Sequence, residues 1–272
     1  MNPVRTTELG NLEAIPSPAL LVFPERVEAN LDRMIGMVGG DVSRLRPHVK
    51  THKMAEVVRL QVAKGITQFK CATIAEAEMT AESGGRDVLL AHQPVGPNLT
   101  RFLQLQERFP EVAFSATVDS SAVVDAFEGT SQPASLFVDV DCGMHRTGIE
   151  PGKGAMTLCR QIAESKHLEF AGLHAYDGHL HQPDLAERTE AHAVAIQTWA
   201  DLLKSLEDQN LAPATIVVGG SPTFGLFAQM ENWQCSPGTT LFWDAGYGHA
   251  FPDLEFETAA MLLTRVISKP GN

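Results

Sequence analysis

The sequence has few cysteines, and no two of them stand at the short spacing typical of a zinc knuckle or a redox motif. Its 272 residues contain 4 cysteines, which are Cys71, Cys142, Cys159 and Cys235. Disulfide frameworks belong to oxidising compartments and to short cysteine-dense chains. We therefore interpret the four residues as reduced thiols and predict a cytoplasmic protein.

Long apolar runs and excess positive charge are also absent. No apolar run approaches the roughly 20 residues of a membrane-spanning helix, and the polar segment 1–18 does not resemble a secretory signal. The 21 basic residues stand against 33 acidic ones, which gives a net charge of −12. This balance disfavours a nucleic-acid or anionic-membrane surface, so we expect neither partner. It still permits one local phosphate pocket.

What the chain does contain is a regular alternation of strand-like and helical patterns. The strand-like runs cover 44–50, 68–73, 87–92, 113–118, 135–141, 170–176, 215–219 and 239–244. Helical patterns begin at Pro24 and near Met54 and also cover 74–83, 98–108 and 183–208.

Such alternation predicts a parallel α/β sheet with right-handed crossovers. Eight strands in about 250 residues are typical of a closed (β/α)8 TIM barrel. A doubly wound open sheet is the alternative. It usually has a glycine-rich first turn, and no such turn follows the apolar run 19–23.

Basic residues are concentrated in the stretch 46–53, at the end of the first predicted strand. Strand periodicity places Arg46, His48 and Lys50 on one face, although a buried parallel strand is normally apolar. Active sites lie at the carboxyl ends of barrel strands. An amine beside two positive groups has a lowered pKa, as Schiff-base chemistry requires, so Lys50 is the candidate nucleophile. The alternative is a strand-to-helix loop with surface lysines.

Polar side chains also occupy the fifth predicted strand. Asp139 and Asp141 share its inward face, and two buried carboxylates need partners. We expect Arg146, just past the strand, to provide one. A structural Asp–Arg pair that braces a loop is the alternative.

The sixth predicted strand places His174 and Tyr176 on one face, where a barrel interior normally holds Val or Ile. A lone histidine there is more often a satisfied core residue, but the pair near the barrel mouth favours a site. His179 and His181 follow closely. Two histidines without a third ligand do not predict a metal site.

The loop after the seventh strand is suited to an anion. Gly219, Gly220 and Ser221 offer consecutive backbone N–H groups, and phosphate sites in barrels follow strands 7 and 8. A plain Gly-Gly-Ser-Pro turn is the alternative. A lysine at strand 1, aromatic and imidazole groups, and a phosphate loop together describe pyridoxal 5'-phosphate.

These motifs resemble those of the D-threonine aldolase / D-serine dehydratase family, fold-type III pyridoxal-phosphate enzymes related to alanine racemase. The resemblance runs from residue 18 to residue 268. The stretch 46–53 is similar to the family's cofactor-lysine motif, 141–148 to its Asp-x-Gly-Met-x-Arg-x-Gly segment, and 219–223 to its phosphate loop.

The resemblance implies an alanine racemase-like barrel over 1–257 and the start of a largely absent C-terminal β-domain at 258–272. It implies that Lys50 carries the cofactor, and that His174 and His179 are candidates for further catalytic acid–base groups. The other implied cofactor-binding residues are His48, Arg146, Tyr176, Gly219, Gly220, Ser221, Thr223 and Tyr247. The divalent metal of the family, Mn²⁺ or Zn²⁺, is held by a His-x-Asp or His-x-Cys pair of the second domain, so we predict no metal ligands here.

The implied function is a pyridoxal-phosphate lyase of D-amino acid metabolism, of the D-threonine aldolase or D-serine dehydratase type. Its substrate is a D-3-hydroxy amino acid, and the expected assembly is a homodimer. The alternatives are an amino-acid racemase of the same fold and a pyridoxal-phosphate-binding barrel without catalysis. We also expect apolar surface at 19–23 and 259–266, where a second domain would pack.

Overall fold

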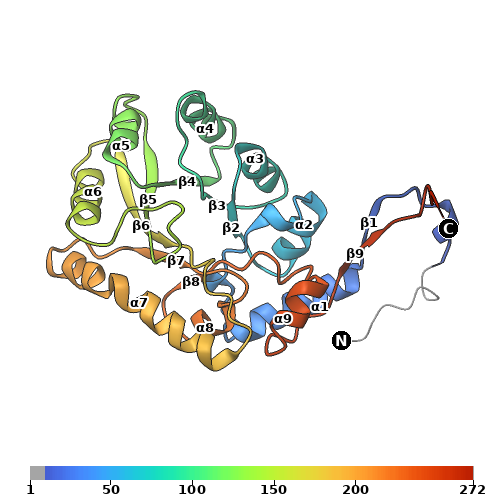
Figure 1. The fold of residues 1–272 in the computed structure, drawn as a ribbon. Helices are drawn as coiled ribbons and strands as arrows, with labels where there is room; N and C mark the ends of the chain where they lie inside the picture. The colour runs from blue at the N-terminus through green and yellow to red at the C-terminus, as the bar shows by residue number, and fades with distance from the viewer. Residues whose placement is uncertain (1–9, 272) are drawn as a thin grey trace.

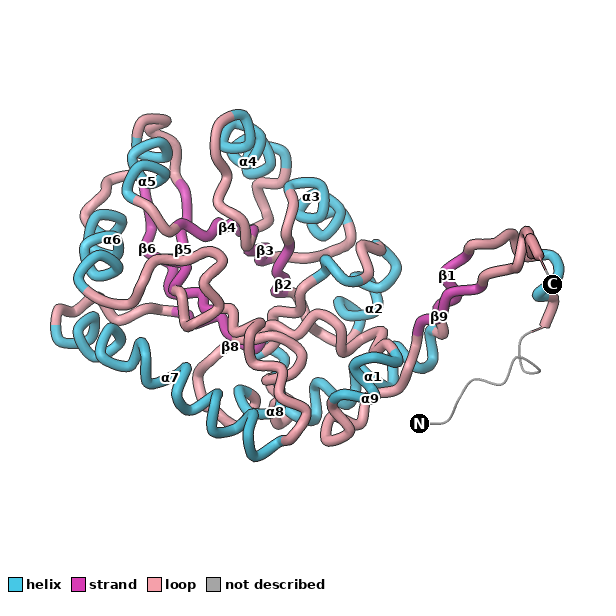
Figure 2. The backbone as a smooth tube through the Cα atoms, viewed as in Figure 1, coloured by secondary structure: helices cyan, strands magenta, loops and turns pink. Residues whose placement is uncertain are grey.

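Seven parallel strands form a curled sheet in the order β2-β3-β4-β5-β6-β7-β8, and helices surround it (Figure 1). The computed structural model describes residues 10–271, so the first half of the polar segment 1–18 lies outside the described residues. The strands lie at the centre and the loops gather between them (Figure 2). No described helix is both long and apolar enough to cross a membrane.

The strands are β1 (Ala19–Val22), β2 (Gln68–Cys71), β3 (Asp87–Leu90), β4 (Ala113–Val118), β5 (Ala134–Val140), β6 (Leu168–Ala175), β7 (Thr215–Val218), β8 (Gln234–Cys235) and β9 (Ala260–Leu263). The helices are α1 (Pro24–Met37), α2 (Ala55–Ala63), α3 (Ile74–Glu82), α4 (Pro97–Arg108), α5 (Ser121–Glu128), α6 (Lys153–Ala163), α7 (Leu185–Asp208), α8 (Phe224–Phe227) and α9 (Ala245–Ala250). The described residues also form three short 3₁₀ helices, η2 (Leu12–Ala14), η3 (Val42–Arg44) and η4 (Val49–Thr51).

The gap between β8 and β2 is bridged by a segment that is not a regular strand. Leu45 forms a parallel bridge to Cys235 of β8, and His48 forms one to Lys70 of β2. Pro47 has no N–H to donate, but its carbonyl oxygen accepts a 2.9 Å bond from the N–H of Lys70. The predicted barrel is confirmed, whereas the first predicted strand, 44–50, consists of two 3₁₀ turns and these bridges.

The eighth predicted strand, 239–244, is wrong. The N–H groups of Phe242 and Trp243 both bond to the carbonyl oxygen of Thr239, which makes this segment a turn, and β8 lies before it. Its apolar side chains are buried in the main core although the segment belongs to no sheet. The predicted helices are confirmed within about two residues at each end, as is usual for helix boundaries.

Two apolar layers build the core. Most buried side chains lie between the strands and the surrounding helices, where Trp199 of α7 is 1 % exposed. A separate small cluster of Leu89, Phe137 and Val217, which come from β3, β5 and β7, is also fully or almost fully buried. The buried polar residues Lys70, Asp139 and His174 occupy neighbouring positions on the strands, towards their carboxyl ends.

A bulge sets the pairing of β5 with β6. The register shifts after Leu136, so that Phe137 pairs with Gly172 and Asp139 pairs with His174. Gly172 has φ of +151°, and a Cβ atom there would lie 1.8 Å from the carbonyl oxygen of Thr215. Only glycine permits this close approach of β6 to β7.

The first and last strands form a separate two-stranded ribbon. β1 pairs antiparallel with β9, and the ribbon extends away from the barrel (Figure 1). Leu20, Leu262 and Val266 are 55 %, 66 % and 86 % exposed, which agrees with the expected apolar surface, although Ala259 is buried. The segment 19–22 therefore accompanies 260–263 instead of joining the barrel.

We predict that Gly172→Ala destabilises the chain by at least about 2 kcal/mol, because the added methyl group overlaps the Thr215 backbone. Gly36→Ala is the matched control. Gly36 lies in α1 with nothing within 4 Å of its added Cβ, and helix propensity favours alanine there by roughly 0.5–1 kcal/mol. Urea denaturation measures both variants. Equal stability of Gly172→Ala and the parent chain would contradict the role given to the bulge.

Candidate active site

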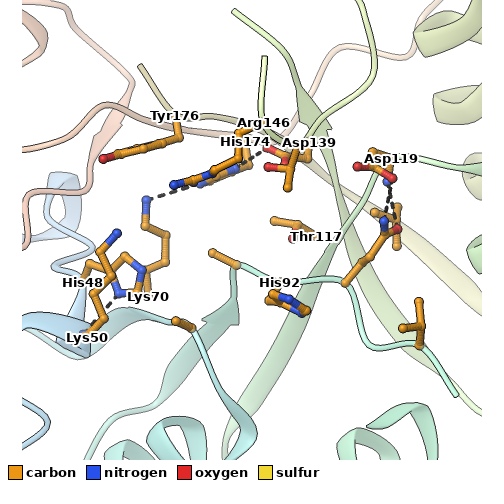
Figure 3. Close-up of a pocket in the computed structure, with 16 residues that line it drawn as sticks. His48, Lys50, Lys70, His92, Thr117, Asp119, Asp139, Arg146, His174 and Tyr176 are labelled. Carbon is orange, nitrogen blue, oxygen red and sulfur yellow. Dashed lines mark hydrogen bonds and ion pairs between the residues drawn. The ribbon is translucent and has the colours of Figure 1, made fainter. Parts of the chain in front are cut away.

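Two cavities meet at the carboxyl ends of the strands. Each has a volume of about 510 Å³, and they share three lining residues: His48, Lys50 and Tyr176. The first extends over the ends of β2 to β6 (Figure 3). The second extends towards the loops that follow β6, β7 and β8. Lys50 therefore lies at the junction of the two cavities.

The fold of the segment before α2 positions Lys50. Lys50 is part of η4, and the ring nitrogen Nδ1 of His48 accepts a hydrogen bond from the Lys50 backbone N–H at 3.3 Å. The residue is exposed, but its amine is crowded by its surroundings. Partial burial lowers the pKa of Lys50, and Arg146 lowers it further, while Glu76 acts in the opposite direction. A larger share of the amine is neutral at pH 7 than in an ordinary lysine.

The basic neighbours expected from strand periodicity are arranged differently. Arg46 is 2 % exposed and forms a bidentate pair with Asp87, with contacts of 2.7 and 2.6 Å. Asp87 begins β3 and Gln234, which also contacts Arg46, begins β8. Arg46 therefore braces the amino end of the barrel, and Arg146 is the cation that affects Lys50.

Tyr176 follows β6 and presents its ring to three cationic groups. The Nζ atom of Lys50 lies 5.1 Å from the ring centroid, the guanidinium carbon of Arg146 lies 4.8 Å away, and Nζ of Lys70 lies 5.8 Å away. Such distances permit cation–π attraction. Arg146 thus stacks on Tyr176 instead of pairing with Asp139 or Asp141.

The two carboxylates of the fifth strand have other partners. Asp139 lies 2.6 Å from Nδ1 of His174 on the neighbouring strand. Asp141 accepts bonds from the backbone N–H groups of Gly143 and His145 and contacts the His145 ring at 2.8 Å. Asp141 therefore holds the loop 141–148 in shape.

The loops after β7 and β8 meet at the hydroxyl of Ser221. Its Oγ atom accepts hydrogen bonds from the N–H groups of Gly238 and Thr239, at 3.2 and 2.8 Å. Ser221, Gly238, Thr239 and Tyr247 all line the second cavity. The N–H groups of Gly238 and Thr239 are used in these bonds, whereas the hydroxyl groups of Ser221, Thr239 and Tyr247 can donate to an oxyanion such as phosphate.

Gly219, Gly220 and Thr223 lie behind this surface and line neither cavity. The N–H of Gly219 bonds to the carbonyl oxygen of Ala175, and the N–H of Gly220 bonds to Oγ1 of Thr223. Burial raises the pKa of Asp177 to about 6, although a hydrogen bond with the Thr223 side chain lowers it. These residues hold the loop after β7 in shape. The groups of this region that line the second cavity come from Ser221 and from the loop after β8, residues 236–239.

The histidines of the sixth strand and its loop have different environments. His174 is 5 % exposed and lines the first cavity. His179 lines neither cavity and lies against Gly143, where its Nε2 atom would be 3.0 Å from an added Cβ. His181 lines the second cavity instead. Within residues 10–271, no three His, Cys, Asp or Glu side chains are grouped to hold a metal ion.

Lys70 is a site residue that the sequence reading missed. It lines the first cavity from β2, is 2 % exposed, and its Nζ atom lies 3.2 Å from Nε2 of His174. The signal was present, because Lys70 stands between the apolar residues Phe69 and Cys71 in the buried part of β2. A basic residue near the carboxyl end of a buried parallel strand is as unusual at Lys70 as at Lys50.

The residues at the junction fit pyridoxal 5'-phosphate. Lys50 offers an amine of lowered pKa to an aldehyde, Tyr176 offers an aromatic wall, and Ser221 with the β8 loop offers donors to a phosphate. Gly238 lets the loop after β8 lie close to the segment that carries Lys50, since a Cβ there would lie 3.1 Å from Oγ1 of Thr51 and 3.4 Å from the His48 side chain. The three groups border one continuous space.

Known proteins of similar sequence are aldolases and dehydratases. The chain is 28 % identical to a D-threonine aldolase of an Arthrobacter species, over 96 % of the chain and 70 % of the relative. It is 28 % identical to a 3-hydroxy-D-aspartate aldolase of Paracoccus denitrificans, over 93 % and 69 %. A D-serine dehydratase of Dictyostelium discoideum is 24 % identical, over 86 % and 64 %.

The structure agrees with these matches. A crystal structure of D-threonine aldolase from Filomicrobium marinum superposes with a TM-score of 0.87 at 28 % identity, over 96 % of this chain and 72 % of that one. The family model described as "Alanine racemase, N-terminal domain" matches residues 23–245. With most of its length covered by that match, the chain belongs to the alanine racemase N-terminal domain family.

Proposed function

We propose that this chain binds pyridoxal 5'-phosphate through Lys50 and is part of a lyase that acts on D-3-hydroxy amino acids. The observation that supports the cofactor is the place of the Lys50 amine, between the Tyr176 ring and the hydroxyl groups of Ser221, Thr239 and Tyr247. The observation that supports the substrate class is the set of relatives, which are named as aldolases and dehydratases of hydroxylated D-amino acids.

The bound cofactor supplies an electron sink for the bond that breaks at the substrate Cα atom. The chain supplies position and charge. The lowered pKa of Lys50 keeps its amine available for attachment, and the Ser221 hydroxyl and β8 loop orient the phosphate. The Arg146 guanidinium, 4.8 Å from the Tyr176 ring centroid, is placed to attract the substrate carboxylate.

His48 acts as a fixed neutral neighbour of the attachment site. Burial, followed by the charges of Lys70 and Lys50, lowers the pKa of His48 well below its usual range. A neutral ring adds no further positive charge beside Lys50. Its Nδ1 atom also fixes the backbone of Lys50 by accepting a hydrogen bond.

We also propose that the working protein is a cytoplasmic homodimer with a second, β-rich unit that begins at the ribbon of β1 and β9. The exposed apolar side chains of Leu20 and Leu262 support this proposal, because such side chains are usually covered by a partner or another domain. Sedimentation velocity of the chain tests the assembly, and a monomer at every concentration would argue against the dimer.

We predict that pyridoxal 5'-phosphate forms a covalent adduct that borohydride fixes on Lys50. Lys50→Ala abolishes the adduct, because among the described residues Lys50 is the one lysine that lines both cavities, whereas Lys70 lines the first alone. Lys53→Ala is the matched control and keeps the adduct, since the Lys53 amine is held by Glu76 at 2.9 Å. Visible absorbance followed by peptide mass spectrometry gives the result. A label on Lys53 in the parent chain would overturn the assignment.

We predict that Arg146→Gln slows adduct formation at neutral pH. Arg146 lowers the pKa of Lys50, so its loss raises that pKa and leaves less neutral amine below it. The pH at which the adduct rate reaches half its maximum therefore moves upward. Arg108→Gln, an exposed change on α4 next to Glu78 and Glu82, serves as the control. An unchanged or lower midpoint for Arg146→Gln would contradict this account of Lys50.

A further inference from the structure

Lys70 is a second lysine amine that reaches the site, from inside the barrel. Its Nζ atom lies 3.2 Å from Nε2 of His174, and Nδ1 of His174 lies 2.6 Å from Oδ1 of Asp139 (Figure 3). Register-paired positions on β5 and β6 hold Asp139 beside His174. The three side chains form one buried chain of contacts, with 2 %, 5 % and 7 % exposure for Lys70, His174 and Asp139.

The chemistry of the donors fixes the direction of these contacts. A carboxylate only accepts hydrogen bonds, so the Nδ1 atom of His174 carries the proton that bonds to Asp139. Burial, followed by the charge of Lys70, lowers the pKa of His174, and the neutral ring then has an unprotonated Nε2 atom. That atom accepts from Lys70. Both ring nitrogens of His174 are engaged. Among Lys70, His174 and Asp139, Lys70 is therefore the side chain that can exchange a proton with a ligand.

Lys70 is surrounded mainly by other charges of the barrel mouth. Burial lowers its pKa to about 7, and the charges of Lys50 and Arg46 lower it as well, whereas Asp139 and Asp177 raise it. The titratable or charged groups that surround it are Arg46, His48, Lys50, Asp139, Arg146, His174, Tyr176 and Asp177. An amine with this pKa is present in both protonation states at neutral pH, as general acid–base catalysis requires.

We propose that Lys70 is the acid–base residue that exchanges a proton with the substrate hydroxyl in the first cavity. In this proposal, Asp139 and His174 are positioning residues that set its proton affinity. The proposal rests on the proposed function, because the hydroxyl is that of a D-3-hydroxy amino acid. Neutral Nζ takes the proton from the hydroxyl oxygen, so an O–H bond breaks as an N–H bond forms. The electron pair of the O–H bond forms the carbonyl of the released aldehyde as the Cα–Cβ bond breaks. The ammonium then gives its proton to solvent, and the Cα atom of the amino acid product gains one from solvent.

Some of the surrounding groups partly offset the effect of burial and positive charge, which disfavour the ammonium that forms. It donates to Nε2 of His174, whose other nitrogen is anchored to the Asp139 carboxylate, and it lies 5.8 Å from the ring centroid of Tyr176. Thr117 also lines this cavity, but a hydroxyl group is a far weaker base than an amine. Asp119 on the same wall is held by Gln93 and by the N–H of Gly148.

The proton affinity of Lys70 is measured on the chain without cofactor. Cyanate adds to neutral amines, so the extent of labelling at Lys70, mapped by peptide mass spectrometry across pH, reports its midpoint. We expect a midpoint near pH 7. Asp139→Asn lowers the midpoint, because the carboxylate raises the pKa of Lys70. Asp119→Asn is the matched control, since it removes a carboxylate of the same cavity that makes no contact with Lys70 or His174, and it leaves the midpoint unchanged.

The role in turnover is measured on the cofactor-loaded chain with D-threonine. Lys70→Gln keeps the borohydride-fixed label on Lys50 but lowers kcat by at least about 100-fold, with a smaller effect on KM. Lys70→Arg restores the positive charge without a group that titrates near pH 7. It therefore fails to restore kcat.

Three results would overturn the proposal: a Lys70 midpoint above about pH 9, no labelling of Lys70 at any pH, or a Lys70→Arg variant with the kcat of the parent. The labelling result needs neither cofactor nor substrate. A parent chain that binds no cofactor contradicts the proposed function, while the midpoint of Lys70 still decides whether this amine exchanges a proton near neutral pH.

Discussion

Backbone hydrogen bonds at the junction of β8 and β2 hold the site together. The N–H of Arg46 bonds to the carbonyl oxygen of Cys235, and the N–H of His48 bonds to that of Pro237, each at 2.9 Å. The hydroxyl of Ser236 adds a 2.9 Å bond to the carbonyl oxygen of Arg46. These contacts join positions about 190 residues apart. Without them, Lys50 would not lie beside the loops that follow β7 and β8, and neither cavity would be complete.

Sequence periodicity was sufficient for the architecture, because the alternation of strands and helices is a local pattern. Apolar alternation gave the strands in order, and Pro24 marked the start of α1. The errors lie where the local rule did not apply. Pro47 interrupts the first segment, so strand parity no longer says which way Arg46 points, and that side chain lies at the opposite end of the barrel. The apolar residues at 239–244 are buried in a turn, which periodicity alone does not distinguish from a strand.

The contacts between site residues were less predictable, because they depend on register between strands. Asp139 faces His174 only because a bulge at Ala171, next to Gly172, shifts β5 against β6 by one position. The sequence of neither strand alone predicts this shift in register. Composition gave an equally incomplete picture of the charge. The chain has a net charge of −12, yet Lys50, Lys70 and Arg146 meet around one tyrosine ring, and burial there favours loss of a proton over three full charges.

The position of Tyr176 has a consequence for how a ligand is held. A Cβ atom on Gly178 would lie 2.4 Å from the ring, and one on Gly220 would lie 3.2 Å from it, so the ring is wedged between two stretches of backbone. Its orientation is therefore fixed before any ligand arrives. When a flat molecule binds at the junction, the Tyr176 ring does not have to reorient, so little ordering entropy is lost on binding. The fixed Tyr176 ring therefore selects among flat molecules by the tilt that their rings adopt in the site, rather than by the size of those rings.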